Sequence, residues 1–370
     1  MKEISAIQYT KSAHPTSFMQ TAQMAQQRQA CGQTVYFFQD KNEFALVNGT
    51  PYPKKTSKYY KYNIWFPNHL SANFIKQLRG WCKTHHGLSL TITPNTPVAI
   101  RDYHGKIIKK LDFDKSVFTN NNFKWHGNIL TAPGTFRQWQ YIVNLDHPYP
   151  ELLKSFKPKV RHSITATQKT GLTVEPVTTK NFPDLIKNLN VTANRRHYSE
   201  RNQEYYAQLL AAFKGDAYGL LVYLDPAKTR KLLQDTIKNS KNIKDGADII
   251  KKAQRQLDII KDLKHKTPIC TGLFIDAPHE TVYFVGGGPD QYFPFSPVYA
   301  IIDHAMQRSI KKQIPRFNLY GVDATFDQPT GLLRFKQQYH GFIEQLPCDY
   351  TATFHPLTTL GLKVKNRLKI

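Results

Sequence analysis

The sequence is short of cysteine, of acidic residues and of long apolar runs. Its four cysteines lie far apart and include no Cys-x-x-Cys pair, which argues against a disulfide scaffold or a zinc module and favours a reducing compartment. No apolar run reaches the roughly 18 residues that a membrane span needs, and the N-terminal segment lacks the apolar core of a signal peptide. The expectation is a soluble cytoplasmic protein without a metal site.

The shortage of acidic residues leaves a large positive charge. Asp and Glu number 27 against 51 Lys and Arg, so the formal net charge is +24. An excess of this size favours polyanionic partners, either nucleic acid or anionic lipid headgroups, with simple solubility as the alternative. The glycine-rich phosphate loops of nucleotide-binding folds are missing, because neither Gly-Lys-Ser/Thr nor Gly-x-Gly-x-x-Gly occurs.

The length and the pattern of elements predict two α/β domains. A chain of 370 residues exceeds one ordinary core, and its hydrophobic content of 40% is enough for globular domains. No internal repeat is visible. Pro148 and Pro150 mark a boundary between a first domain, 1–147, and a second, 148–346, and residues 347–370 are expected to return to the first.

Hydrophobic periodicity places several elements in the first half. Phe74, Leu78 and Trp81 follow one another at spacings of four and three, which predicts a helix over 70–85. Apolar and β-branched residues predict strands, the first two of them forming a hairpin. These strands are 34–38, 44–47, 88–93 and 136–145.

Residues 226–266, called the arm below, differ in composition from the rest of the chain. They contain no aromatic residue, and two apolar stripes of helical period flank a polar break, which predicts two antiparallel helices of a short coiled coil. The segment has 12 Lys and Arg against 5 Asp and Glu, a net charge of +7. The strands on either side, 219–224 and 269–275, would be neighbours in a sheet. Such an insertion could bind a phosphate backbone or mediate dimerisation.

Three groups of residues are candidates for a site. In 316–346 a strand breaks at Gly321, and a loop then leads to a helical turn with Lys336, which is either a surface lysine or a catalytic one. Lys159 and Arg161 lie on a basic helix, either as a solvated face or as phosphate contacts. Arg201 and Tyr205 are four residues apart and so share a helix face.

Four blocks in the second half, taken in order, resemble the C-terminal part of the FemABX family of non-ribosomal peptidyltransferases. They are KPKVRHSITATQKTGLTV (157–174), RRHYSERNQEYYAQLLAAF (195–213), TVYFVGGGPDQYFPFSPVYAIIDHAM (281–306) and 316–346, with RFNLYG and GLLRFKQ. Members of the family add amino acids from aminoacyl-tRNA to peptidoglycan precursors. The resemblance implies two acetyltransferase-like (GNAT-type) α/β domains with the arm inserted in the second.

The resemblance also implies roles and partners. Lys336, in the family's Phe-Lys pair with Phe335, would stabilise the tetrahedral oxyanion. Arg201 matches an arginine that pairs with acceptor phosphate, Tyr205 stands beside it, and Tyr283 is a further expected substrate contact. The co-substrate is aminoacyl-tRNA, with no other cofactor. The acceptor is lipid II or UDP-MurNAc-pentapeptide, the lipid-linked form being favoured, with contact to the anionic inner face of the membrane.

Two departures and two rival functions stand beside this resemblance. Some relatives have a lysine where this chain has Gln26, and the family's acidic residue after the fourth strand aligns with Thr93. An acyl-CoA-dependent N-acyltransferase would show an Arg/Gln-x-x-Gly-x-Gly turn, which the sequence lacks. A non-catalytic RNA-binding protein would explain the charge and the arm, but not the four ordered blocks.

Overall fold

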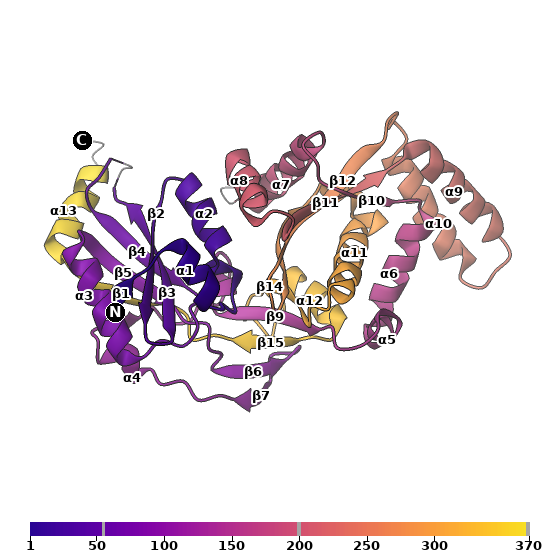
Figure 1. Ribbon diagram of the computed structural model, residues 1–370. Coiled ribbons are helices and arrows are strands. Elements are labelled where there is room, and N and C mark those ends of the chain that lie inside the picture. The colour runs from indigo at the N-terminus through magenta and orange to yellow at the C-terminus, as the bar shows by residue number, and fades with distance from the viewer. Residues whose placement is uncertain (54–55, 198–200, 368–370) are drawn as a thin grey trace.

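The computed structural model describes residues 1–53, 56–197 and 201–367 (Figure 1). Within these residues the strands form two sheets, in the orders β1-β2-β3-β4-β5-β16-β8 and β10-β11-β12-β13-β14-β9-β15-β6-β7. Each sheet is the centre of one lobe, and the two lobes lie side by side. The predicted α/β class is confirmed.

The first sheet comprises β1 (Lys2–Glu3), β2 (Thr34–Asp40), β3 (Glu43–Pro51), β4 (Tyr60–Trp65), β5 (Gly87–Thr93), β8 (Lys124–Trp125) and β16 (Tyr350–Thr353). The second comprises β6 (Ala99–Asp102), β7 (Ile107–Lys110), β9 (Trp139–Asn144), β10 (Thr173–Pro176), β11 (Ala217–Leu224), β12 (Thr267–Asp276), β13 (Thr281–Gly287), β14 (Arg316–Gly321) and β15 (Phe342–Gln345). The periodicities of the first half therefore predicted real elements: the hairpin is β2–β3, and the later strands are β5 and β9.

The helices are α1 (Ala6–Ser12), α2 (Ala22–Ala30), α3 (Ala72–Thr84), α4 (Ser116–Thr119), α5 (Tyr149–Ser155), α6 (Pro158–Lys169), α7 (Phe182–Arg196), α8 (Gln203–Phe213), α9 (Pro226–Asn239), α10 (Gly246–Ile259), α11 (Pro297–Lys311), α12 (Gly331–Lys336) and α13 (Pro356–Arg367). Short 3₁₀ turns are η1 (Phe18–Gln20), η2 (Thr135–Arg137), η3 (Asp290–Phe295) and η4 (Gln337–Tyr339). None of the helices in the described part of the chain is long and apolar enough to cross a bilayer.

The two lobes repeat one order of elements. In the first, α1 and α2 precede three antiparallel strands, β2 to β4, and α3 then crosses to the parallel strand β5. In the second, α7 and α8 precede β11 to β13, and α11 crosses to the parallel strand β14. The repeat is one of topology, which explains why no repeat is visible in the sequence. Both lobes have the acetyltransferase-like arrangement that the resemblance implied.

The lobes exchange strands, so the boundary expected at residue 147 does not divide the sheets. β9, with β6 and β7, belongs to the second sheet, where β9 lies between β14 and β15. Five of its residues, from Trp139 to Val143, are buried, as expected of a strand inside a sheet that is covered on both faces. In the other direction, β16 crosses back and pairs with β5 and β8 in the first sheet.

The arm forms two helices, α9 and α10, at the end of the second lobe farthest from the first (Figure 1). The flanking strands β11 and β12 pair with each other, so the arm interrupts a hairpin. Its base is fixed to the lobe. The Thr229 hydroxyl donates to the carbonyl of Thr170 at 2.9 Å, and the Gln256 amide donates to that of Pro294 at 3.0 Å.

The second sheet has a different core on each face. Helices α6, α11 and α12 cover one face with the apolar cluster that includes Phe274, Phe317 and Tyr339. Helices α7 and α8 cover the other, where their apolar side chains join Phe18 and Met24 of the first lobe in one cluster. The junction between the lobes therefore lies on the α7–α8 face.

Candidate functional site

The second lobe opens between β13 and β14. Within the described residues these parallel strands pair at Thr281 with Phe317 and at Val282 with Asn318, and then they separate. The equivalent strands of the first lobe, β4 and β5, stay paired to their ends. The opening, called the splay below, leaves backbone carbonyl groups of β14 without a strand on that side, so other donors must satisfy them.

A bend in β14 turns these carbonyls toward α12. Tyr320 has a left-handed backbone, with φ of 67°, which is uncommon for a residue with a side chain. The side-chain oxygen of Asn318 holds this bend by accepting the Tyr320 N–H at 2.8 Å. The pairing of β14 with β9 is irregular over the same residues.

Lys336 fills the splay from the end of α12. Its Nζ donates to the carbonyls of Leu319 at 2.6 Å, Gly321 at 2.7 Å and, more weakly, Tyr320 at 3.4 Å. These three acceptors match the three N–H donors of an ammonium. The side chain is only 4% exposed, so Lys336 is a buried lysine and not the surface lysine that the sequence left open.

Burial lowers the pKa of Lys336 to about 7, against the opposite influence of Asp323. Asp323 is itself buried and accepts the N–H of Ala132 at 3.0 Å. The amine and ammonium forms of Lys336 therefore coexist near neutral pH. In its charged form the side chain is a fixed, buried donor at a place where negative charge could develop.

Phe335 and Tyr283 lie on the α11 face of the sheet. The Phe335 ring contacts those of Tyr299 and Tyr339, at centroid distances of 5.3 and 5.7 Å. Tyr283 stacks on Phe274 at 5.0 Å in the same core. Tyr283 is therefore separated by the sheet from Arg201 and Tyr205, with which the sequence grouped it.

Arg201 and Tyr205 lie on the other face and are neighbours, but Arg201 precedes Asn202, the N-cap of α8, so the two do not share a helix face as their spacing predicted. The Arg201 guanidinium is 4.6 Å from the centre of the Tyr205 ring and 5.3 Å from that of Phe284 on β13. Tyr320 joins this cluster to Lys336: its ring lies 6.0 Å from Phe284, while its backbone carbonyl accepts from Lys336. Its hydroxyl is buried and has no hydrogen-bond partner in the part of the chain that the structure describes.

A second arginine reaches the cluster from the first lobe. Arg28 of α2 is 7% exposed and donates to the side-chain oxygen of Asn48. Burial lowers its pKa to about 10, with Tyr205 and Tyr320 acting in the opposite direction. Gln26 on the same helix is exposed, so the cation that α2 contributes is Arg28. The sequence analysis missed it, because one arginine in a helix of glutamine and alanine gives no signal of burial.

Thr93, at the end of β5, contacts a carboxylate that comes from another part of the chain. The Thr93 hydroxyl donates to Asp349 at 2.6 Å, and Arg137 forms an ion pair with the same carboxylate. Asp349 precedes β16, which comes from the far end of the chain. Sequence spacing could not have joined these residues, because only the exchange of strands brings them together.

Arg161 and Lys159 lie apart from both groups. Arg161 of α6 donates to the backbone carbonyls of Lys154, at 3.0 Å, and Phe156, so it holds the end of α5. Lys159 lines an open groove between α6 and α10. The expected substrate-binding residues thus fall into four places: the α7–α8 face, the α11 face, this groove and, for Arg161, the end of α5.

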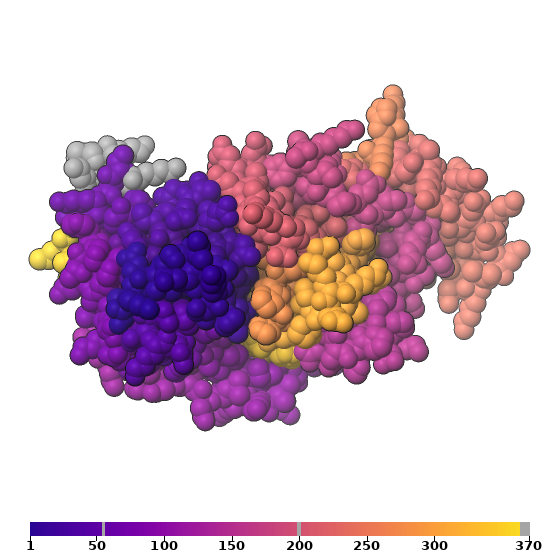
Figure 2. All heavy atoms as spheres, in the orientation of Figure 1, coloured from indigo at the N-terminus to yellow at the C-terminus, as the bar shows by residue number. Residues whose placement is uncertain are grey.

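A cavity of about 700 Å³ lies between the lobes. It opens where the indigo N-terminal residues meet the coral and orange segments of the second lobe in Figure 2. Phe18 lines it, and its ring lies 5.9 Å from that of Phe284, beside Arg201. The cavity therefore adjoins the arginine cluster. Among the residues that the structure describes, no three His, Cys, Asp or Glu side chains are grouped to hold a metal ion.

Two acetyltransferase-like lobes, with a buried lysine in the splay of the second, place the chain in that fold class. The chain matches the FemAB family model over residues 5–364 and belongs to the FemAB family. The predicted family is confirmed, and with it the enzyme class of aminoacyltransferases.

Individual relatives agree with this assignment. Aminoacyltransferase FemA of Staphylococcus aureus (strain bovine RF122 / ET3-1) is 23% identical over 335 residues, which cover 80% of this chain and 79% of the relative. FemA of Staphylococcus epidermidis is 22% identical over 310 residues, which cover 75% of this chain and 74% of the relative. The crystal structure of FemX superposes with a TM-score of 0.72 at 17% identity, over 98% of this chain and 100% of FemX, which confirms the fold.

Proposed function

We propose that the protein transfers an amino acid from aminoacyl-tRNA to the side-chain amine of a peptidoglycan stem peptide, with the lipid-linked precursor as acceptor. The amine attacks the ester carbonyl, a C–N bond forms and the ester C–O bond breaks. The proton lost by the amine ends on the ribose oxygen that leaves. An aminoacyl ester is already activated, so the protein has to align the substrates and stabilise the tetrahedral oxyanion.

The observation that supports this proposal most is the position of Lys336. Two short contacts, to Leu319 and Gly321, hold its Nζ in the splay, while the contact to Tyr320 at 3.4 Å is weak. A substrate carbonyl oxygen would replace this weak acceptor, and the ammonium would bind it more strongly as it gains charge. Phe335 would fix the lysine by packing against Tyr299 and Tyr339.

The acceptor would bind between the lobes. Both candidate precursors carry a diphosphate, and two arginines from different lobes, Arg28 and Arg201, act electrostatically on Tyr320. Guanidinium groups suit phosphate oxygens, and the Tyr320 hydroxyl would donate to the same anion. We infer that this cluster recognises the diphosphate and that the cavity of about 700 Å³ admits the rest of the acceptor.

The test is transfer of radiolabelled amino acid from a charged total-tRNA pool to purified lipid-linked and UDP-linked precursors. Lys336→Met is compared with wild type and with Lys109→Met, a control on the exposed strand β7. We expect label on the lipid-linked precursor, a loss of about 10²- to 10³-fold in Lys336→Met and none in the control. Equal transfer by Lys336→Met would remove the lysine from catalysis. RNA binding without transfer to either precursor would favour the non-catalytic RNA-binding protein.

A further inference from the structure

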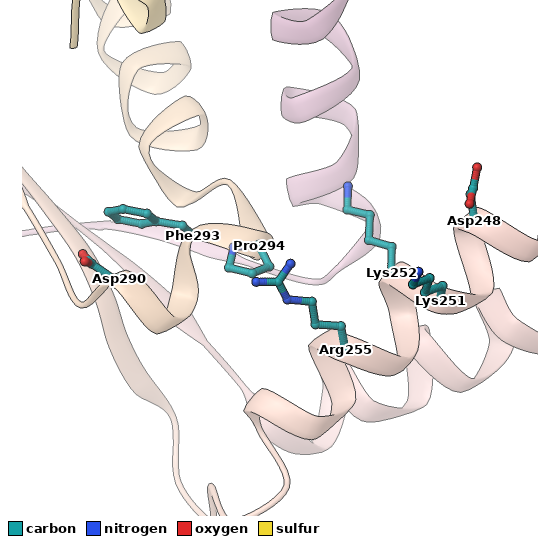
Figure 3. Close-up of a pocket in the computed structure, with 7 residues that line it drawn as sticks. All are labelled: Asp248, Lys251, Lys252, Arg255, Asp290, Phe293 and Pro294. Carbon is teal, nitrogen blue, oxygen red and sulfur yellow. The ribbon is translucent and has the colours of Figure 1, made fainter. Parts of the chain in front are cut away.

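Helix α6, turn η3 and helix α10 enclose a groove on the α11 face of the second lobe (Figure 3). Two hollows of about 680 and 500 Å³ share Lys252, Phe293 and Pro294, so they form one continuous groove. The hydrogen bond from Gln256 to the Pro294 carbonyl fixes α10 to η3. The groove is therefore a built feature of the folded lobe, although its walls come from three distant parts of the sequence.

The charge of the groove is positive. Its basic side chains are Lys159, His162, Lys251, Lys252 and Arg255, and its acidic ones are Asp248 and Asp290. Asp290 already forms an ion pair with Arg195, so its charge is compensated. In Figure 3 the side chain of Arg255 extends from α10 toward Pro294, and that of Lys252 extends toward the end of the neighbouring helix. The groove thus offers several cations to one elongated anionic ligand.

An exposed aromatic ring lies among these cations. Phe293 is 56% exposed, although large apolar side chains are usually buried, and the Arg195 guanidinium lies 5.2 Å from its ring centre. An exposed ring beside several cations is the arrangement that proteins use to bind single-stranded nucleic acid, with a base stacked on the ring and phosphates against the cations. A flat bilayer could not enter a concave groove between rigid helices.

We propose that this groove binds a single-stranded segment of RNA, with a base on Phe293 and phosphates against Lys251, Lys252 and Arg255. The proposal deepens the proposed function and depends on it for the identity of the RNA, namely the aminoacyl-tRNA. The groove connects to the reaction site through α6, since the N–H of Lys157 donates to the carbonyl of Gln338, two residues after Lys336, at 3.0 Å. The tRNA would then approach on the α11 face and the acceptor on the α7–α8 face.

The test is binding of a short fluorescein-labelled single-stranded RNA of mixed sequence to the full chain, followed by fluorescence anisotropy over a range of salt concentrations. The double variant K251Q/K252Q is compared with K109Q/K110Q, which removes the same charge from the exposed strand β7. If both groove lysines contact phosphates, K251Q/K252Q lowers the slope of log K against log salt by about 1.4, and K109Q/K110Q leaves it unchanged.

Substitutions of Phe293 separate stacking from charge. Phe293→Ala is expected to weaken RNA binding by about 5- to 150-fold, the range for loss of one base stack, and Phe293→Trp to retain it. Phe293→Leu keeps an apolar side chain without a π face, so it should bind as weakly as Phe293→Ala. Equal binding by the leucine variant and wild type would overturn the stacking role.

The remaining outcomes separate this proposal from the proposed function. It is overturned if the two double-lysine variants bind RNA equally, or if the groove variants lose binding to anionic phosphatidylglycerol vesicles and keep RNA binding. If wild type transfers amino acid and the groove variants show unchanged KM for charged tRNA, the groove proposal fails alone. If wild type transfers nothing but RNA binding still depends on the groove, the proposed function fails alone.

Discussion

The ammonium of Lys336 is buried among three backbone carbonyls, and burial disfavours its charged form. In Lys336 burial lowers the pKa from 10.5 to about 7. The unfolded chain then binds more protons than the folded one between these values, so this group makes the folded state more stable as pH rises through that window. The same shift makes the side chain mostly neutral above pH 7, and its support of an oxyanion should decline there.

The first prediction concerns this pH dependence of stability. Between pH 7 and 10.5 the free energy of unfolding of wild type should rise relative to that of Lys336→Met, since methionine does not titrate. Urea denaturation of both proteins at several pH values measures the difference. Curves that run parallel across this window would show that Lys336 keeps an ordinary pKa in the folded protein.

The second prediction concerns the hydroxyl of Tyr320. Because it is buried without a hydrogen-bond partner among the described residues, Tyr320→Phe should leave the free energy of unfolding unchanged or raise it slightly. If the hydroxyl donates to the acceptor diphosphate, the same substitution raises the acceptor KM roughly tenfold or more. Tyr283→Phe, on the opposite face of the sheet, is the control and should leave this KM unchanged. A fall in stability without a change in KM would assign Tyr320 a structural role.

At the scale of elements, the segment from β14 to α12 determines where Lys336 lies. Gly321 ends β14 against η2, and a Cβ on it would lie 2.7 Å from the backbone nitrogen of Phe136. The backbone cannot yield as a flexible side chain would. Gly331, at the start of α12, has open space at the Cβ position. The two glycines therefore differ in the space around them although one loop joins them.

The third prediction follows from this difference. Gly321→Ala should destabilise the protein by about 1–3 kcal/mol and reduce transfer, because β14 must move away from η2 and carry with it the carbonyls that hold Lys336. Gly331→Ala should be neutral or slightly stabilising, by up to about 1 kcal/mol. Thermal unfolding and the transfer assay test both. A destabilised Gly331→Ala would mean that α12 needs the freedom of glycine.

Individual elements were largely predictable from the sequence, and their partners were not. The periodicity of 70–85 predicted α3, because it is a local property of the chain. The Arg201–Tyr205 spacing predicted a shared helix face, which was wrong because α8 begins only after Asn202, although the two side chains are neighbours. Tyr283 was placed on the wrong side of the sheet because β13 has apolar side chains on both of its faces. Its sequence therefore does not show which of the two faces packs against α11. Arg28 likewise becomes part of a site only where α2 meets α8.

At the scale of the whole molecule, the exchange of β9 and β16 between the two sheets means that neither lobe is one continuous segment of the chain. The proline-marked boundary near residue 147 is a real change of structure, since α5 begins there, but the sheets cross it in both directions. A boundary drawn from composition assumes that neighbours in sequence are neighbours in space. That assumption fails for strands, which need only a free edge of a sheet to pair with.

The fourth prediction tests this exchange by truncation. Removing residues 347–370 takes β16 out of the first sheet, and with it Tyr350, whose ring stacks on Phe118 at 4.4 Å, and the ion pair of Asp349 with Arg137. The first lobe should lose cooperative unfolding, although its remaining elements precede β9. Removing only residues 356–370 takes α13, where Leu357 and Leu360 are exposed, and should leave the lobe folded.

Amide hydrogen exchange in β4 and β5 is the measurement that distinguishes these outcomes, because it reports on the first lobe alone. Protection should fall throughout both strands in the longer truncation, since β5 loses a paired neighbour and the apolar cluster loses two buried side chains, Tyr350 and Ala352. The shorter truncation should exchange as wild type does. Equal protection in the two truncated chains would mean that the first lobe folds without β16, and that the returning strand serves only to bring Asp349 to Thr93 and Arg137.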